Sequence, residues 1–134
     1  MTEAEDLARR AWEAFNRQDY EALLELVHPD MEWRPAQGPG GIEGQVYLGR
    51  DGYRKWLYED LPEVWENFHA EELEFADTGD GRVMISGYIA GKGRGSGAEI
   101  RVPFSQLGWA RDGRIVRIDG FLTRDGAREA AGVR

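Results

Sequence analysis

The amino-acid sequence predicts an α+β fold in which a curved antiparallel sheet wraps around three N-terminal helices. In residues 1–65, apolar side chains recur at helical spacing in three separate segments. In residues 70–123, apolar and polar residues alternate as they do in strands, and turn sequences such as "DTGDG" and "RDGR" divide this part of the chain. Helices followed by a meander of strands are typical of an α+β domain.

Three helices are predicted in the N-terminal half. The first spans residues 2–16 and begins at the capping box "TEAE". The second spans residues 20–27, and Asp19 can cap its first turn. The third begins at Asp51, and Pro62 can start a further turn after it. Each segment has apolar residues three or four positions apart, so each is expected to bury one face.

A short strand and a meander complete the predicted elements. The short strand is "MEWRP", residues 31–35, in which Glu32 and Arg34 point the same way because strand side chains alternate. The meander is predicted to comprise strands at 70–77, 82–90, 98–111 and 115–123. A last helical segment runs from residue 124 to Gly132.

Composition and charge restrict the classes of function. No linker divides the 134 residues, so one domain covering residues 1–134 is expected. The net charge of −8 argues against nucleic acid as a partner, because phosphate binding depends on clustered Lys and Arg. The absence of Cys and the presence of only two His make a bound metal unexpected. No apolar run is long enough to span a membrane and the N-terminus is charged, so a cytoplasmic location is predicted.

Five stretches, read in order, resemble one known family. They are "AFNRQDYEALLELVHPDMEWRP", "YLGRDGYRKW", "GKGRGSGAEIRV", "RDGRIVRIDGF" and the closing "EAAG". Together they resemble the SnoaL-like branch of the nuclear transport factor 2 and ketosteroid isomerase superfamily over nearly the whole chain. The resemblance implies a cone-shaped, cystatin-like α+β roll around a pocket, and commonly a homodimer. Members include isomerases, epoxide hydrolases, polyketide cyclases, dehydratases and binding modules, so the resemblance does not fix a reaction.

The residues that match the catalytic positions of the steroid isomerases have different chemistry. In those enzymes a helix tyrosine and a protonated aspartate stabilise the enolate, while a second aspartate moves the proton. The resemblance places these positions on Ala11, on Ser105, and on Arg34 or Pro35. Because Arg stays protonated near neutral pH, Arg34 cannot act as the general base. Ketosteroid isomerisation is therefore not expected.

The resemblance also implies a pocket inside the cone. It makes the odd-numbered face of strand 98–111 the inner one. The pocket would then be walled by Trp12, Phe15, Trp33, Trp56, Leu107, Trp109, Ile118 and Gly120. Its polar groups would be Glu32, Arg34, Arg101 and Ser105. An apolar cavity with a few fixed polar groups is typical of a ligand site.

Glu32 and Arg34 are the first candidates for catalysis in such a pocket. Arg34 and Arg101 would bind a carboxylate, enolate or carbonyl oxygen, and Glu32 would be the carboxylate able to act as a base. The apolar residues of the last strand should face inward, which leaves Asp119 outside. A shift of one residue would turn Asp119 inward as an alternative catalytic acid. A structural interpretation stays open, in which the Trp residues are ordinary core and Glu32 pairs with Arg34 or Arg101.

Two functions follow from these observations. In the first, the protein binds or converts a small, mostly apolar, oxygen-bearing molecule as a cofactor-independent isomerase, cyclase or hydrolase. In the second, it is a non-catalytic ligand-binding or dimerisation module. A homodimer through the outer face of the sheet is also expected, because four apolar residues are assigned to that face: Ile100, Val102, Phe104 and Phe121.

Overall fold

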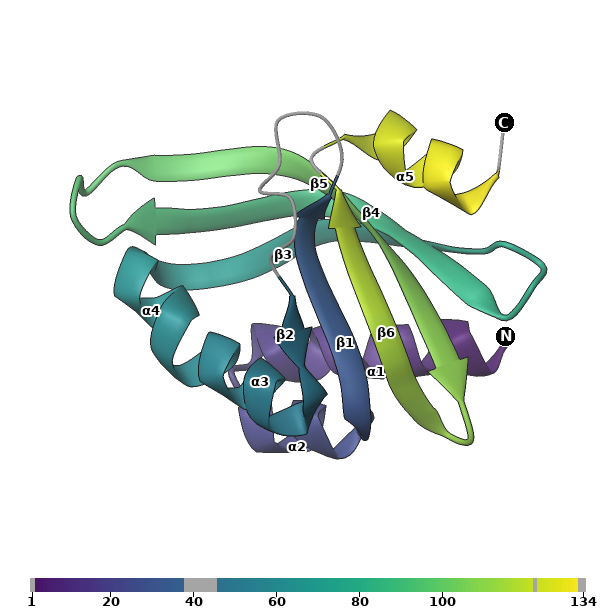
Figure 1. The fold of residues 1–134 in the computed structure, drawn as a ribbon. Coiled ribbons are helices and arrows are strands. Elements are labelled where there is room, and N and C mark those ends of the chain that lie inside the picture. Colours follow the sequence, from purple (N-terminus) through teal and green to yellow (C-terminus); the bar gives the residue numbers. More distant parts are fainter. Residues whose placement is uncertain (1, 38–45, 122, 133–134) are drawn as a thin grey trace.

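The structure is a computed structural model that describes residues 2–37, 46–121 and 123–132 (Figure 1). Its helices are α1 (Glu3–Asn16), α2 (Tyr20–Glu25), α3 (Gly49–Lys55), the π-helical turn η1 (Trp56–Asp60), α4 (Leu61–Val64) and α5 (Arg124–Ala131). Its strands are β1 (Val27–Gln37), β2 (Tyr47–Leu48), β3 (Trp65–Asp77), β4 (Arg82–Gly93), β5 (Glu99–Arg111) and β6 (Arg114–Phe121). None of the helices in these ranges combines the length and the apolar composition needed to cross a membrane.

The strands form a curved, unclosed sheet in the order β2-β1-β6-β5-β4-β3 (Figure 1). Neighbouring strands are antiparallel except β1 and β6, which run parallel. Helix α1 and the helical segments up to α4 pack on the concave face, which we call the inner face. Helix α5 packs on the opposite, outer face. The predicted α+β class, with a curved sheet around N-terminal helices, is confirmed.

The ends of α1 and α5 follow from the local sequence. The Thr2 hydroxyl accepts a hydrogen bond from the Glu5 amide at 3.2 Å, as the capping box predicts. In α5 the Thr123 hydroxyl accepts from the Gly126 amide at 2.9 Å, and Gly132 closes the helix with a φ of 72°. Because these signals involve only a few neighbouring residues, both helices lie where the sequence predicts them.

The segment after α1 differs from the prediction. Helix α2 ends at Glu25, because β1 already begins at Val27, which pairs with Ile115 of β6. The Leu26 carbonyl accepts a hydrogen bond from the Ile115 amide at 2.8 Å. This pairing joins residues far apart in the sequence, so a local periodicity argument does not detect it. The two-residue strand β2 was missed for the same reason.

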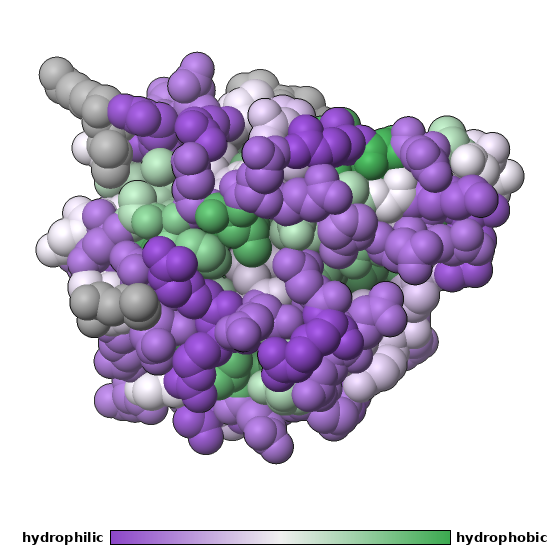
Figure 2. All heavy atoms as spheres, turned by 180° about the vertical axis from the view of Figure 1, so that it is seen from behind, coloured by the Kyte–Doolittle hydropathy of each residue, from purple (hydrophilic) through white to green (hydrophobic). Residues whose placement is uncertain are grey.

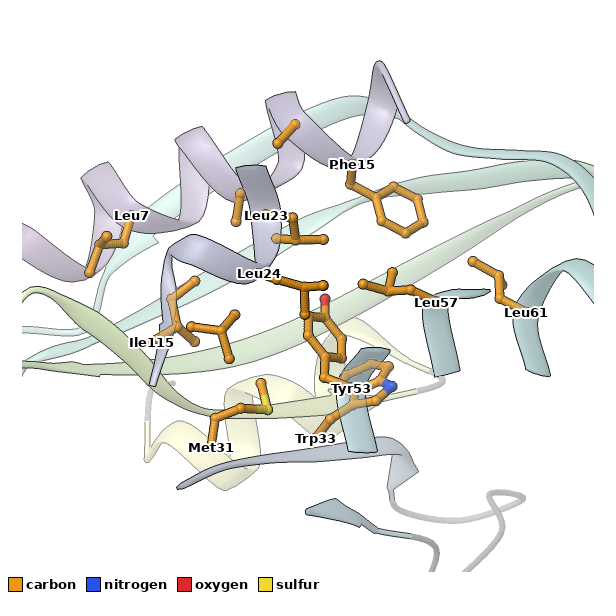
Figure 3. Packing of buried hydrophobic residues seen from close by; sticks show 13 residues of the cluster. Leu7, Phe15, Leu23, Leu24, Met31, Trp33, Tyr53, Leu57, Leu61 and Ile115 are labelled. Carbon is orange, nitrogen blue, oxygen red and sulfur yellow. The ribbon is translucent and has the colours of Figure 1, made fainter. Parts of the chain in front are cut away.

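Apolar clusters stabilise both faces of the sheet. The inner cluster joins the inner-face helices to β1 and β6 (Figure 3), and its larger members are Leu7, Phe15, Leu23, Leu24, Met31, Trp33, Tyr53, Leu57, Leu61 and Ile115. The outer cluster joins α5 to β5 and β6 and contains Leu107, Phe121, Ala127 and Ala131. Since β5 and β6 are covered on both faces, their alternation alone does not reveal which face is the inner one.

Figure 2 shows the side of the molecule that is turned away in Figure 1, where hydrophilic residues predominate and apolar ones gather near the middle. The four apolar residues assigned to the outer face do not form a patch there. Phe104 lies on the inner face, with its ring 5.3 Å from that of Trp12, and Ile100 and Val102 share its side of β5. Phe121 does lie outside but packs in the outer cluster beneath α5. The homodimer stays a prediction, without the apolar patch that motivated it.

Candidate functional site

The inner face of the sheet encloses a small cavity next to α1. Side chains from the inner-face helices and from β1, β5 and β6 line it: Ala11, Trp12, Phe15, Leu23, Trp33, Tyr53, Trp56, Gln106 and Ile118. We call this space the inner cavity, and its volume is ≈ 30 Å³. The cavity is therefore too small, as it stands, for a ligand of several rings.

Aromatic rings form most of the cavity wall. Trp33 and Trp56 meet edge to face with their centroids 5.1 Å apart, and Tyr53 stacks on Trp56 at 5.9 Å with an interplanar angle of 4°. On α1, Trp12 and Phe15 meet edge to face at 5.1 Å. Such rings attract one another at these separations and offer flat apolar faces to a ligand. The wall is therefore suited to a flat, largely apolar molecule.

Three of the lining residues carry polar groups, and all three groups are neutral at neutral pH. The Trp33 indole nitrogen is buried and has no hydrogen-bond partner among the described residues. The Gln106 amide lines the cavity, and no hydrogen bond joins it to another part of the described chain. Burial, and then the neighbouring Tyr20, raise the pKa of the Tyr53 hydroxyl, which therefore stays protonated. An unpaired buried donor costs about 1–3 kcal/mol, so a ligand oxygen that pairs with Trp33 would remove this cost.

A second cavity adjoins the first and also has a volume of ≈ 30 Å³. The two cavities share Ala11, Trp12, Gln106 and Ile118 as lining residues. Trp12 has the largest side chain of these four and is only partly buried. Trp12 is therefore the largest side chain that borders both cavities.

Glu32 and Arg34 do not face the inner cavity. Trp33 lies between them in the sequence and points inward, so both of its neighbours point outward, as strand geometry requires. In the parallel pairing of β1 with β6, Glu32 lies beside Arg117 and Arg34 lies beside Asp119. The prediction that Glu32 and Arg34 are pocket residues is wrong.

These four charged side chains form an ion-pair cluster on the outer face. Arg34 Nη2 donates to Glu32 Oε2 at 3.1 Å, and Arg117 donates to both carboxylate oxygens of Asp119, at 2.9 and 2.8 Å. The bond to Asp119 raises the pKa of Arg117. Asp119 lies outside, as the alternation of the last strand predicts, and its alternative placement in the pocket is wrong. Among the described residues, no group of three or more potential metal ligands occurs.

Strand β5 presents its even-numbered residues, including Gln106, to the inner face. Its odd-numbered residues lie on the outer face, so the pocket placement is wrong for Arg101, Ser105 and Leu107. Trp109 does not line the inner cavity but does border the adjoining one. Leu107 and Trp109 pack in the outer cluster, and Arg101 pairs with Glu71. The prediction failed because α5 also buries apolar side chains on the outer side of this strand, so both faces of β5 look like core in the sequence.

The predicted pocket residues that do meet in the inner cavity are Trp12, Phe15, Trp33, Trp56 and Ile118. Gly120 pairs with Gln106 in the ladder between β5 and β6, and so lies on the same face. Sequence reasoning missed Tyr53 and Gln106 as site residues. The helical spacing of Tyr53 indicated only that it is buried, and Gln106 would have followed from the even-numbered face of β5.

A comparison with protein families decides the classification. The SnoaL-like domain matches residues 8–118 of this chain. The chain belongs to the SnoaL-like family. No curated protein matches this SnoaL-like chain.

Solved structures share the fold of this SnoaL-like chain at low sequence identity. A "putative polyketide cyclase" from Xanthomonas campestris pv. campestris is 22% identical with a TM-score of 0.76, and the match covers 92% of this chain and 93% of that one. TerC, crystallised with polyporic acid, is 24% identical with a TM-score of 0.76, covering 98% and 99%. A "putative isomerase" from Bacillus subtilis is 20% identical with a TM-score of 0.74, covering 100% and 98%. These likenesses establish the nuclear transport factor 2-like fold of the SnoaL-like chain, and at such identities they establish the fold alone.

Proposed function

We propose that this SnoaL-like protein binds a flat, mostly apolar, oxygen-bearing small molecule in the inner cavity. The observation that carries the proposal is an aromatic wall combined with unpaired neutral polar groups, the Trp33 indole and the Gln106 amide. Aromatic faces favour a flat ring system, and an amide can donate to or accept from a hydroxyl or carbonyl group. The naming of one solved neighbour as a polyketide cyclase and the crystallisation of TerC with polyporic acid support a ligand of this kind.

The lining residues also limit the chemistry. The described lining contains an amide, a phenol and indoles, but no carboxylate and no histidine. These groups orient and polarise a ligand oxygen, but they do not accept a proton near neutral pH. Binding without chemistry is therefore the first candidate. The second candidate is an isomerase-type or cyclase-type reaction, which the Trp33 and Gln106 donors favour because they would stabilise a developing oxyanion.

A ligand of this size requires the inner cavity to open. Small-molecule sites commonly have volumes of about 300–1,000 Å³, whereas the inner cavity has ≈ 30 Å³. We assign the opening to Trp12, because its large side chain borders both the inner cavity and the adjoining one and is only partly buried. Trp12→Ala should therefore bind bulky ring compounds more tightly than the unmodified protein does.

Calorimetric titration with 2-naphthol and naphthalene tests the proposal. The unmodified protein should bind 2-naphthol about fivefold more tightly than naphthalene, because a neutral hydrogen bond contributes about 1 kcal/mol. Gln106→Leu should remove this preference and keep the affinity for naphthalene. Ser105→Ala is the matched control, since Ser105 is the next residue on β5 and lies on the outer face. It should leave both affinities unchanged.

Two results would contradict the proposal, and a third would contradict its first candidate, binding without chemistry. Absence of binding by both the unmodified protein and Trp12→Ala would mean that the cavity is not a ligand site. Loss of the naphthol preference in Ser105→Ala, with retention in Gln106→Leu, would mean that the inner face of β5 is wrongly assigned. Turnover of a 3-oxo-Δ5-steroid well above background would show that the cavity lining performs proton transfer after all.

A further inference from the structure

We propose a second, separate site: an anion-binding depression that takes a phosphoryl group. Its lining residues come from α1, α2, α3 and the turn that precedes β6. Figure 1 shows where these four elements lie. The volume of the depression is ≈ 560 Å³, and its charged lining residues are Arg10, Glu21, Glu25, Arg50, Arg54 and Arg114. It shares no lining residue with the inner cavity.

Two of these arginines lack a counter-charge. Every arginine in the described part of the chain has a carboxylate oxygen within 4.0 Å, except Arg50, Arg114 and Arg128. Such exceptions are notable in a chain that carries 25 acidic residues against 17 basic ones. Arg50 and Arg114 line the same depression, so positive charge without a counter-charge is concentrated there. An anion is the natural partner of such a charge.

The structure holds Arg50 in a fixed orientation. Its Nε and Nη2 atoms donate to the Val27 carbonyl at 3.2 and 2.6 Å, and the residue is half-buried. This carbonyl is neutral, so it orients the guanidinium without cancelling its charge. The Nη1 atom has no partner among the described residues and is free to donate to a ligand. A guanidinium fixed in advance loses less side-chain entropy when a ligand binds.

The remaining charged groups determine the net charge of the depression. Arg54 donates to Glu21 at 2.7 Å, and Tyr58 also donates to Glu21, so this carboxylate is engaged on the rim. Arg10 pairs with an exposed Asp6 at 3.4 Å, a contact that water and salt weaken. Glu25 lines the depression without a basic partner and opposes an anion there. Two unneutralised arginines outweigh this one acid.

The arrangement of donors favours a tetrahedral phosphoryl group. The arginines that line the depression come from three parts of the chain, α1, α3 and the start of β6. A planar carboxylate is satisfied by donors in one plane, whereas a phosphoryl group accepts from several. The volume leaves space for the small molecule that carries the group.

Calorimetric titration with pyrophosphate at constant ionic strength tests this site. Arg114→Gln should weaken pyrophosphate binding about tenfold, the loss expected for one charge-assisted hydrogen bond. Arg128→Gln is the matched control, because it removes the same charge from another arginine without a carboxylate partner, on α5 and outside the depression. It should leave the affinity unchanged, and Glu25→Gln should increase it.

Three outcomes would overturn the proposal. The first is the absence of any heat of binding up to about 10 mM pyrophosphate. The second is an equal loss of affinity in Arg114→Gln and Arg128→Gln, which would show a response to net charge rather than to a site. The third is malonate binding as tight as pyrophosphate binding, which would rule out selection of a phosphoryl group.

Discussion

Asp119 and Arg117 should be strongly coupled, whereas Glu32 and Arg34 should not, although the two pairs are neighbours on the outer face. The Asp119 side chain is only 10% exposed and accepts two hydrogen bonds from Arg117. Net contributions of hydrogen bonds to charged groups are about 1.5–3 kcal/mol each. Arg117 is 39% exposed, so water restores part of the loss when the partner is removed. We therefore expect a coupling of about 1.5–3 kcal/mol for this pair, below the full value for two buried bonds.

The Glu32–Arg34 pair has the features of a surface contact. Its side chains are 37% and 34% exposed, and one hydrogen bond of 3.1 Å joins them. Exposed ion pairs contribute about 0–1 kcal/mol. We therefore expect a smaller coupling energy for Glu32 and Arg34, because both side chains point outward. A pair enclosed among Trp rings would be coupled by several kcal/mol.

Two double-mutant cycles, read by chemical denaturation, measure both couplings. One cycle uses Asp119→Ala and Arg117→Met, in which Met keeps an apolar stem over the Trp109 ring. The other uses Glu32→Gln and Arg34→Met. A coupling below about 0.5 kcal/mol for the first pair, or a larger coupling for the second pair than for the first, would refute the reasoning.

Three further predictions concern the sheet. A Cβ atom on Gly87 would lie 2.7 Å from the Glu71 carbonyl oxygen, so Gly87→Ala should lower the free energy of unfolding by about 1–3 kcal/mol. Gly95 has open space around it, so Gly95→Ala should leave the stability unchanged, and thermal denaturation of both variants compares them. Bonds from the His69 ring to the Asn67 carbonyl and the Glu71 carboxylate raise its pKa above 6.5. The protonated ring therefore stabilises the fold at low pH, and this contribution is lost as the pH rises through the pKa of His69 in the folded protein. His69→Gln should cost more stability at about pH 5 than at about pH 8, and an equal cost at both pH values would contradict this prediction. If the outer face forms a homodimer, light scattering should give twice the monomer mass of 15.2 kDa, and the monomer mass itself would refute the dimer.

The sequence was most informative where structure depends on neighbouring residues. The caps Thr2 and Gly132 and the turns between strands are local signals, and the elements they bound lie close to their predicted positions. The start of β1 at Val27 depends instead on pairing with Ile115, far away in the sequence. Such pairing has no local signature.

The candidate site was predicted only in part, for a reason that β5 makes clear. Large aromatic residues such as Trp33 and Trp56 are buried in almost any fold, so the sequence suffices to place them in the core. Polar residues depend on the face of each strand. Helix α5 covers the outer side of β5, so Leu107 looked like an inner residue and Gln106 like an outer one. Only the strand register shows that the reverse holds.

A crystal structure of the protein with bound 2-naphthol would show whether the inner cavity is the ligand site. We expect the naphthol ring to lie inside the cone between Trp12 and Trp56, with its oxygen within hydrogen-bonding distance of the Gln106 amide. We also expect the Trp12 side chain to move from its present position at the border of the two cavities. Naphthol bound only outside the cone, or inside with its oxygen away from Gln106, would contradict the account.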